Sequence, residues 1–178
     1  SEEQTNKIEK FFNLWAKSKI PDYKKLTNLH SKGTDAFKTS FLGGDVLTIL
    51  RIENQSVTVQ VVDGEQVVTP FDDEGKGKNN TITNGVETDQ KGRQVAFWIK
   101  QNDKDVMAES VRIKAKDRNG NLRAWLIYGS KHRIDHHRGI PVISSILEKV
   151  SKLDRYTEAS VSKAEKVADL IHTFEHND

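Results

Sequence analysis

The sequence contains no cysteine, and no run of apolar residues in it approaches the roughly 20 that a membrane-spanning helix needs. The missing cysteines exclude disulfides and thiolate metal sites. Apolar residues make up only 35% of the 178 positions, whereas 30% are charged. A chain of this composition is either well solvated or needs neighbouring molecules to bury its apolar surface.

Motifs that bring nucleophilic catalysis or nucleotide hydrolysis are also missing. The sequence has no G-x-S-x-G nucleophile elbow, no G-x-x-x-x-G-K-[ST] phosphate loop and no G-x-G-x-x-G dinucleotide motif. The short run Gly75-Lys76-Gly77-Lys78 is not followed by a helical pattern, so it does not replace them. We therefore expect a protein that is not an enzyme and needs no cofactor.

The net charge of +2 hides an uneven distribution of charge along the chain. Residues 90–139 contain 12 Lys and Arg against 5 Asp and Glu, a local excess of +7. Alternation along strands turns many of these basic side chains outward, which favours a solvated basic face. The other interpretation is a surface that meets phosphate.

Two helical patterns open the chain. The first is a stripe of residues at the i, i+3, i+4, i+7 spacing of one helix face: Ile8, Phe11, Phe12 and Trp15. Pro21 ends this pattern, and Asp22 is the candidate N-cap of a second helix that closes at Gly43-Gly44. We expect both helices to cover another layer of the fold.

Strand patterns fill the middle of the chain. Five segments have the alternation or the β-rich composition of strands: residues 46–52, 56–62, 94–99, 106–115 and 122–128. Asp63-Gly64 predicts a turn back to Val67-Val68, and residues 72–80 have the composition of a loop. Short turns without strand–helix–strand alternation predict an α+β fold, with the N-terminal helices packed on a mostly antiparallel sheet or small barrel.

Residues 85–99 give the clearest local signal, a strand, a polar turn and a second strand. The turn has the pattern Asp-x-x-Gly, in which Asp89 can bond its own backbone and Gly92 supplies a positive φ. In the second strand Val95, Phe97 and Ile99 alternate with other side chains. The segment therefore predicts a β-hairpin.

A long helix, or two nearly collinear helices, is predicted after Pro141, which suits a first helical turn. Residues spaced alternately four and three apart form an a/d seam: Ile146, Val150, Leu153, Thr157, Ser160, Ala164, Val167 and Ile171. The first six are candidates for packing between subunits, because small residues let a neighbouring helix approach closely. The alternative is a helix that packs on its own domain. The predicted organisation is an α+β domain at 1–137 and a long helical segment at 138–178.

Two groups of histidines could bind a metal. His132, Asp135, His136 and His137 lie within six positions, but their spacing matches no helical metal site, and neighbouring Lys and Arg oppose a dication. A solvated or anion-binding loop is the favoured interpretation. His172 and His176 have the i, i+4 spacing of a helical metal site, which we interpret as a chance pairing. We therefore predict no metal site.

Four segments, in order, resemble the lambda-type portal proteins of tailed phages. Gly85-Val86-Glu87-Thr88-Asp89 to Ala96 resembles the family's "G-[VI]-E-x-D-x-x-G-R-x-V-A" run. The others are Phe41–Val46, with Gly44-Asp45, then Val62–Pro70, with Asp63-Gly64, then Arg138-Gly139-Ile140-Pro141 followed by Leu153–Ala159. The chain departs from the family pattern in lacking the parts beyond the long helix and in a shorter connection from Tyr128 to Arg138.

The resemblance implies a structural protein of a tailed phage or prophage. Portal proteins form a ring, usually of twelve subunits, at one capsid vertex; the ring docks the packaging motor (terminase), passes double-stranded DNA and joins other head and tail proteins. The implied location is the virion, with assembly in the host cytoplasm and no membrane. The implied fold is a wing-like α+β domain leading into stem helices. Because the chain begins at Ser1 and stops soon after a helical pattern, we expect a fragment of a longer protein.

The resemblance also suggests roles for basic residues on the long helix. Lys149, Lys152 and Arg155 are candidates for facing DNA in the ring's lumen, through contacts that do not depend on sequence. The plainer interpretation is that they are ion-pair partners at i, i+3 and i, i+4 on a solvated helix. An alternative for the whole chain is a free-standing, non-specific nucleic-acid-binding domain that uses the basic residues 90–139.

Overall fold

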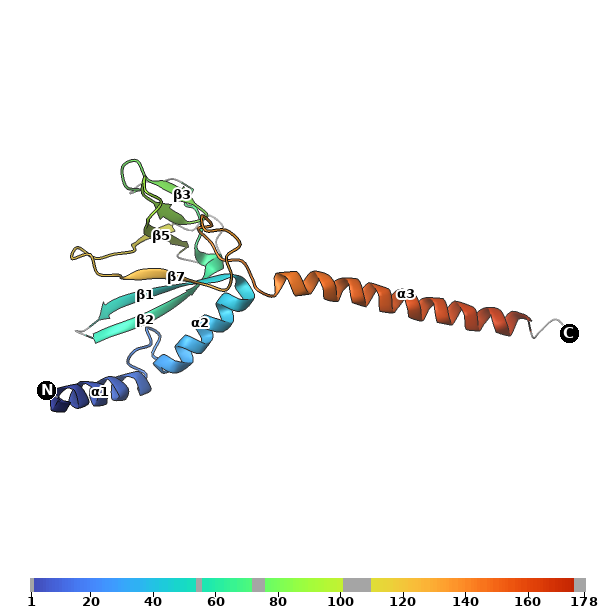
Figure 1. Ribbon diagram of the computed structural model, residues 1–178, viewed down its shortest axis with the longest axis horizontal. Helices are drawn as coiled ribbons and strands as arrows, with labels where there is room; N and C mark the ends of the chain where they lie inside the picture. The colour runs from blue at the N-terminus through green and yellow to red at the C-terminus, as the bar shows by residue number, and fades with distance from the viewer. Residues whose placement is uncertain (1, 54–55, 72–75, 101–109, 175–178) are drawn as a thin grey trace. The chain divides into compact units, whose positions relative to one another are not determined.

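The computed structural model describes residues 2–53, 56–71, 76–100 and 110–174, with side chains as far as residue 169 in the last helix. The elements in chain order are α1 (Glu2–Lys17), α2 (Leu29–Gly43), β1 (Asp45–Glu53), β2 (Ser56–Asp63), the 3₁₀ turn η1 (Gly64–Gln66), β3 (Thr81–Thr83), β4 (Val86–Thr88), β5 (Gln94–Lys100), β6 (Ser110–Lys114), β7 (Ala124–Tyr128) and α3 (Ser144–Phe174) (Figure 1). Contacts divide the chain into two units, Ser1–Val142, called the body below, and Ile143–Asp178.

The body contains two antiparallel sheets. One has the strand order β2-β1-β7 and the other the order β3-β4-β5-β6 (Figure 1). β2 returns along one edge of β1, and β7 pairs with the other edge, with Asp45 opposite Tyr128 and Ile49 opposite Ala124. The predicted α+β class and antiparallel pairing are confirmed. The described strands form two open sheets rather than the small barrel that the sequence left as an alternative.

Apolar side chains from both sheets meet in one core. Its members are Leu47, Ile49, Val62, Val67, Val86, Phe97, Ile99, Ala115, Ala124 and Leu126. The alternation predicted for β5 accounts for its share, because Phe97 and Ile99 point into the core while Trp98, between them, points to the opposite face. Burial of this apolar surface supplies the main favourable term in folding the body.

The hairpin predicted at residues 85–99 is confirmed as β4, a polar turn and β5. The Asp89 carboxylate accepts hydrogen bonds from the backbone N–H groups of Lys91 and Arg93, each at 2.9 Å. Gly92 has a φ of 75°, which the missing side chain permits. These two residues perform the roles that the Asp-x-x-Gly pattern predicted.

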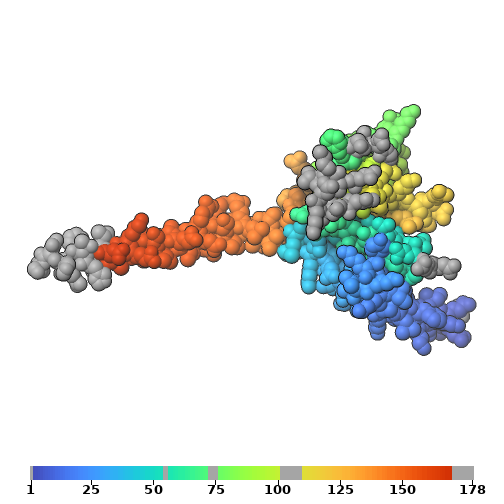
Figure 2. All heavy atoms as spheres, turned by 180° about the vertical axis from the view of Figure 1, so that it is seen from behind, coloured from blue at the N-terminus to red at the C-terminus, as the bar shows by residue number. Residues whose placement is uncertain are grey.

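The two N-terminal helices differ in how far they are covered. α2 contacts β1, β2 and β7, and it buries Ala36 and Ser40. α1 contacts α2 but has no buried residue, and Phe11 in its apolar stripe is 63% exposed. Figure 2 shows the two helices, in blue and cyan, on one side of the body. The covering role predicted for both helices therefore describes α2 better than α1.

The predicted N-cap of α2 was wrong. Asn28 is the N-cap, and its side chain accepts from the N–H of Ser31 at 2.9 Å. Asp22 is buried instead, in a loop that β2 holds through the backbone bond from Val59 to Pro21. Burial opposes ionisation of Asp22, but Lys32 and three backbone N–H groups outweigh it, so its pKa lies well below the usual range.

The turn at Asp63-Gly64 does not return the chain onto β2. Gly64 instead begins η1, with Asp63 as its N-cap, and Val67 then bridges to Ile99 of the other sheet. Val67 is 3% exposed, because it fills the core between the sheets, and this burial decides its partner. The loop prediction at 72–80 and the strand prediction at 106–109 fall partly or wholly outside the described residues.

The long helix is continuous, and it begins later than predicted. α3 runs from Ser144 to Phe174 without a break at Asp154, so the single-helix alternative is the correct one. Pro141 precedes the helix instead of occupying its first turn, because Ile140 and Val142 still bond to the body, through Ser130 and Phe41. No helix in the described residues combines the length and apolar character that crossing a membrane requires.

Gly129, directly after β7, offers a sharp test of how closely α2 packs against the sheet. A Cβ at Gly129 would overlap the backbone carbonyl of Ser40 at the end of α2, so G129A should lower the free energy of unfolding by about 1–3 kcal/mol. Gly33, in the middle of α2, has open space where a Cβ would lie, so G33A should raise that energy by up to about 1 kcal/mol. Urea denaturation of both variants measures the two effects, and equal stability of G129A and the natural chain would contradict this packing.

Candidate functional site

α3 carries all the residues predicted for subunit packing and for DNA contact. Because α3 is one regular helix, the six seam residues share one face. All are exposed, with Ile146 at 51%, Val150 at 46% and Leu153 at 63%. Lys149, Lys152 and Arg155 are exposed as well, and their role remains a prediction.

Charges on α3 are segregated on the two sides of this seam. In the heptad set by the seam, Asp154 occupies position e, and Glu158 and Glu165 lie beyond it at b. Lys149 and Lys163 occupy position g, and lysines at c lie beyond them. One flank of the seam is therefore acidic and the other basic. We call these the acidic flank (Asp154, Glu158, Glu165) and the basic flank (Lys149, Lys152, Lys163, Lys166).

Few of these charges are neutralised within α3. Lys152 pairs with Glu148 at 2.7 Å, but both side chains are more than 60% exposed. Exposed pairs of this kind contribute only about 0.5 kcal/mol or less, so Lys152 stays available for another partner. Among residues 144–169, neither Lys149 nor Asp154 forms an ion pair.

The hydroxyl groups of the two polar seam residues, Thr157 and Ser160, already donate hydrogen bonds within α3. The Thr157 hydroxyl donates to the carbonyl of Leu153 at 2.9 Å, and the Ser160 hydroxyl donates to the carbonyl of Tyr156 at 2.8 Å. A hydroxyl with such a partner costs less to bury than one that loses its bond to water. These two positions are therefore compatible with a buried contact along the seam.

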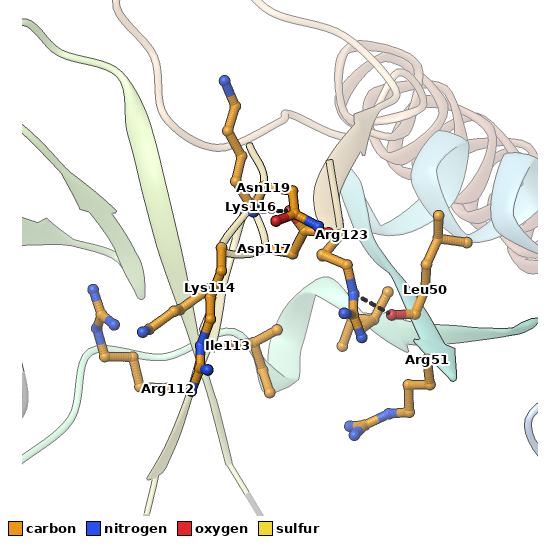
Figure 3. Close-up of a pocket in the computed structure, with 11 residues that line it drawn as sticks. Leu50, Arg51, Arg112, Ile113, Lys114, Lys116, Asp117, Asn119 and Arg123 are labelled. Carbon is orange, nitrogen blue, oxygen red and sulfur yellow. Dashed lines mark hydrogen bonds between the residues drawn. The ribbon is translucent and has the colours of Figure 1, made fainter. Parts of the chain in front are cut away.

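The body carries a second charged feature, a groove of about 620 Å³ beside β6. Figure 3 shows its lining residues, with Leu50, Arg51 and Arg123 on one side and Arg112, Ile113 and Lys114 on the other. The segment after β6 closes one end of the groove and contributes four polar side chains, those of Lys116, Asp117, Arg118 and Asn119. We call this feature the basic groove. Sequence reasoning found its excess of charge in residues 90–139 but missed the contribution of Arg51, which comes from β1.

One of the groove's cations, Arg112, is neutralised by a carboxylate. Arg112 forms a bidentate ion pair with Glu87, at 2.6 and 2.9 Å, and Trp98 donates to the same carboxylate at 3.2 Å. Gly77 and Asn80 donate to its other oxygen. Burial of Glu87 opposes its ionisation, but these donors and Arg112 outweigh it and lower its pKa to about 2.

A second buried ion pair joins Asp45 at the start of β1 to Arg138 before α3. The Arg138 guanidinium holds the carboxylate at 2.7 and 2.8 Å, and the N–H of Gly139 donates to the same group at 2.7 Å. The remaining N–H groups of Arg138 donate to three backbone carbonyls, those of Gly64, Val67 and Asn84. This network, called the Arg138 junction below, brings together three of the segments on which the family resemblance rests. The sequence offered no sign that these segments meet.

The histidine cluster predicted as a possible metal group does not assemble into one. Nowhere in the described ranges do three His, Asp or Glu side chains gather as a metal ion would require. His132 and Asp135 are exposed, and His136 and His137 are only partly covered. The loop instead leads directly into Arg138. His172 lies in a part of α3 whose side chains are outside the described residues, so the predicted chance pairing stays untested.

Glu87 makes the stability of the body depend on pH. Its folded pKa of about 2 lies below the ordinary value of 4.5, so its stabilising effect is complete above pH 4.5 and is lost as the pH falls towards 2. E87Q leaves Arg112 unpaired and should lower the free energy of unfolding at pH 7 by about 3 kcal/mol. Denaturation between pH 2 and 7 should show this gap shrinking below pH 4.5.

The exposed residue Glu148 provides the control for this measurement. E148Q breaks only a solvated pair, so it should change the free energy of unfolding by no more than about 0.5 kcal/mol at every pH. If the curves of E87Q and the natural chain ran parallel from pH 2 to 7, Glu87 would not be the acid-sensitive group.

Comparison with known proteins identifies the family. The family model described as "Phage portal protein, lambda family" matches residues 1–178, the whole chain. Among curated proteins we found no significant match. The resemblance drawn from four ordered segments is thereby confirmed, and the Arg138 junction shows how three of them meet in space. The chain belongs to the lambda family of phage portal proteins.

Proposed function

We propose that the chain is a structural subunit of a portal ring, through which double-stranded DNA is packaged into a phage capsid and ejected from it. Family membership makes it a portal protein, which places it with the virion. The observation that carries ring assembly is the pattern on α3: an exposed seam between an acidic and a basic flank. Large exposed apolar surfaces of this kind mark interaction sites.

The flanks favour one orientation of neighbouring copies. In a parallel pair of helices, position g of one faces position e of the other, five residues further along. Lys149 of one copy then meets Asp154 of the next. In an antiparallel pair, like positions face each other, which sets lysine against lysine. Opposite flanks therefore favour parallel helices, the arrangement that rotation about a ring axis produces.

Contact with DNA in this proposal is electrostatic. Lys152 and Arg155 provide cations without a base-reading geometry, and Lys149 does so where it is not paired with Asp154 of a neighbouring copy. Such contacts bind phosphate independently of sequence. This suits DNA that must slide through the ring. The subunit performs no catalysis in this scheme and needs no cofactor, since a separate packaging motor hydrolyses nucleotide.

The remaining parts of the proposal follow from the family. The ring, of twelve subunits in the full-length protein, would dock the terminase motor and later the head and tail proteins. It would occupy one capsid vertex after assembly in the host cytoplasm, in a phage or a prophage. The wing-like domain at 1–137 and the stem-like segment at 138–178 would divide these contacts.

Charge reversal tests the parallel assembly. D154K with E158K puts lysines on both sides of the seam at facing positions, and K149E with K163E puts acidic side chains at both g positions, opposite Asp154 of the neighbouring copy. Sedimentation should show that each variant self-associates at least tenfold more weakly than the natural chain, because like charges then face each other. An equimolar mixture of the two variants should recover association. A natural chain that stays monomeric at every concentration, or variants that associate as it does, would contradict the proposal.

Salt dependence tests the contact with DNA. Replacing Lys149, Lys152 and Arg155 by Gln should reduce the slope of log affinity against log salt by about 0.9 for each lost phosphate contact. The matched control replaces three exposed lysines of α1 (Lys7, Lys10 and Lys17) by Gln, with the same change in net charge. Fluorescence anisotropy with a 20-base-pair duplex measures both. Equal slopes for the two variants would remove α3 from the DNA path.

The basic groove is compatible with a second function, that of a free-standing nucleic-acid-binding domain. That function would place the phosphate contacts on Lys114, Lys116 and Arg118, three exposed cations of the groove. Their replacement by Gln would then weaken duplex binding and flatten its salt slope, while the α3 variant would bind normally. The portal proposal gives the opposite ranking of the two variants.

A further inference from the structure

The basic groove combines features that phosphate binding alone does not explain. Its lining includes apolar side chains (Ile49, Leu50 and Ile113) between the cations. Ile49 is buried, and Ile113 packs partly against the core, so both have fixed positions. Apolar contacts gain nothing from a phosphate but stabilise a ligand that carries apolar side chains.

The cations at the rim remain available to a ligand. Arg112 is held by Glu87, and Arg123 donates to the carbonyl of Leu50 at 3.3 Å. Lys114, Lys116 and Arg118 are exposed, and in the described part of the chain none of them forms an ion pair. The groove therefore presents three unpaired positive charges around a partly apolar floor, which is complementary to an acidic and partly apolar ligand.

The position of the groove along β6 indicates an extended ligand. Arg112, Ile113 and Lys114 are consecutive residues of β6, and all three line the groove. Successive side chains of a strand point to opposite faces, so a cavity that all three line follows the edge of the strand. β6 is the last strand of its sheet, and within the described residues no strand pairs with the other edge of Ser110–Lys114. Directly after it, Ala115 accepts from Arg123 and Ala124, which ends the free edge there. An edge of this kind can accept an added strand.

We propose that the basic groove binds an extended acidic peptide segment, with alternating apolar side chains, from a partner protein. The segment would pair with the free edge of β6, set its apolar side chains on Ile49, Leu50 and Ile113, and place its carboxylates beside Lys114, Lys116 and Arg118. A volume of about 620 Å³ suits a few residues of an extended chain. Duplex DNA is far wider and would leave the apolar floor unused. The proposal does not rest on ring assembly or on contact between α3 and DNA.

The test uses a fluorescein-labelled octapeptide of alternating Glu and Val and the complete 178-residue chain. Anisotropy at low salt should show saturable binding that weakens as salt is added. Lys114→Glu with Lys116→Glu should weaken this binding at least tenfold. Lys7→Glu with Lys10→Glu on α1, with the same change in net charge, should change it less than twofold. Thermal unfolding of both variants shows that the body is intact.

Two further probes separate this site from general electrostatic attraction. An alternating Glu–Ser peptide keeps the charge and loses the apolar contacts, so it should bind at least fivefold more weakly. A Glu–Val peptide N-methylated at every residue has no backbone N–H group to donate to β6 and should also bind at least fivefold more weakly. Equal binding of all three peptides would overturn the proposal, as would an unlabelled 20-base-pair duplex that binds more tightly through Lys114 and Lys116. No saturable binding of the first peptide would overturn it as well.

Discussion

The ion pair between Asp45 and Arg138 is the constraint on which the arrangement of the body depends. The Asp45 side chain is 2% exposed, and all the N–H groups of Arg138 have acceptors. Removing either partner would leave a buried charge unpaired, which typically costs about 3–5 kcal/mol. One side chain thus fixes the start of β1, η1, the turn before β4 and the segment that leads to α3. These contacts give the family motifs at these places a structural role.

Ion pairing also decides which of the many basic residues can meet a ligand. Residues 90–139 carry a charge excess of +7, but the cations within it differ in their partners. Arg112 and Arg138 neutralise buried carboxylates, whereas Lys114 and Lys116 project from the surface without ion pairs in the described residues. Arg112 and Arg138 stabilise the fold, whereas Lys114 and Lys116 give the basic groove cations that a ligand can meet. A count of charges along the chain cannot separate these roles, because each depends on a partner distant in sequence.

This distinction also explains which parts of the fold were predictable. The hairpin turn at Asp89 and the continuous seam of α3 depend on residues within a few positions of one another, so their patterns were sufficient. Asp22 and Asn28 are both good N-caps, and the choice between them depends on β2, which binds the loop around Pro21. The strand partner of Val67 and the contact from Asp45 to Arg138 likewise join segments that are far apart in the sequence. Only the assembled core could reveal them.

In the proposed assembly, the charge pattern on α3 would constrain the direction of neighbouring subunits but not their number. Opposite flanks favour parallel neighbours, and a parallel pair, an open row and a closed ring all satisfy that preference. A row of subunits closes into a ring only if the rotation from each subunit to the next is a whole fraction of a full turn. A seam of six residues on a single helix cannot set that rotation. Contacts between the bodies of neighbouring subunits would have to set it. In the proposed ring, α3 would determine which way neighbouring subunits face, and the wing-like domain at 1–137 would determine how many complete the ring.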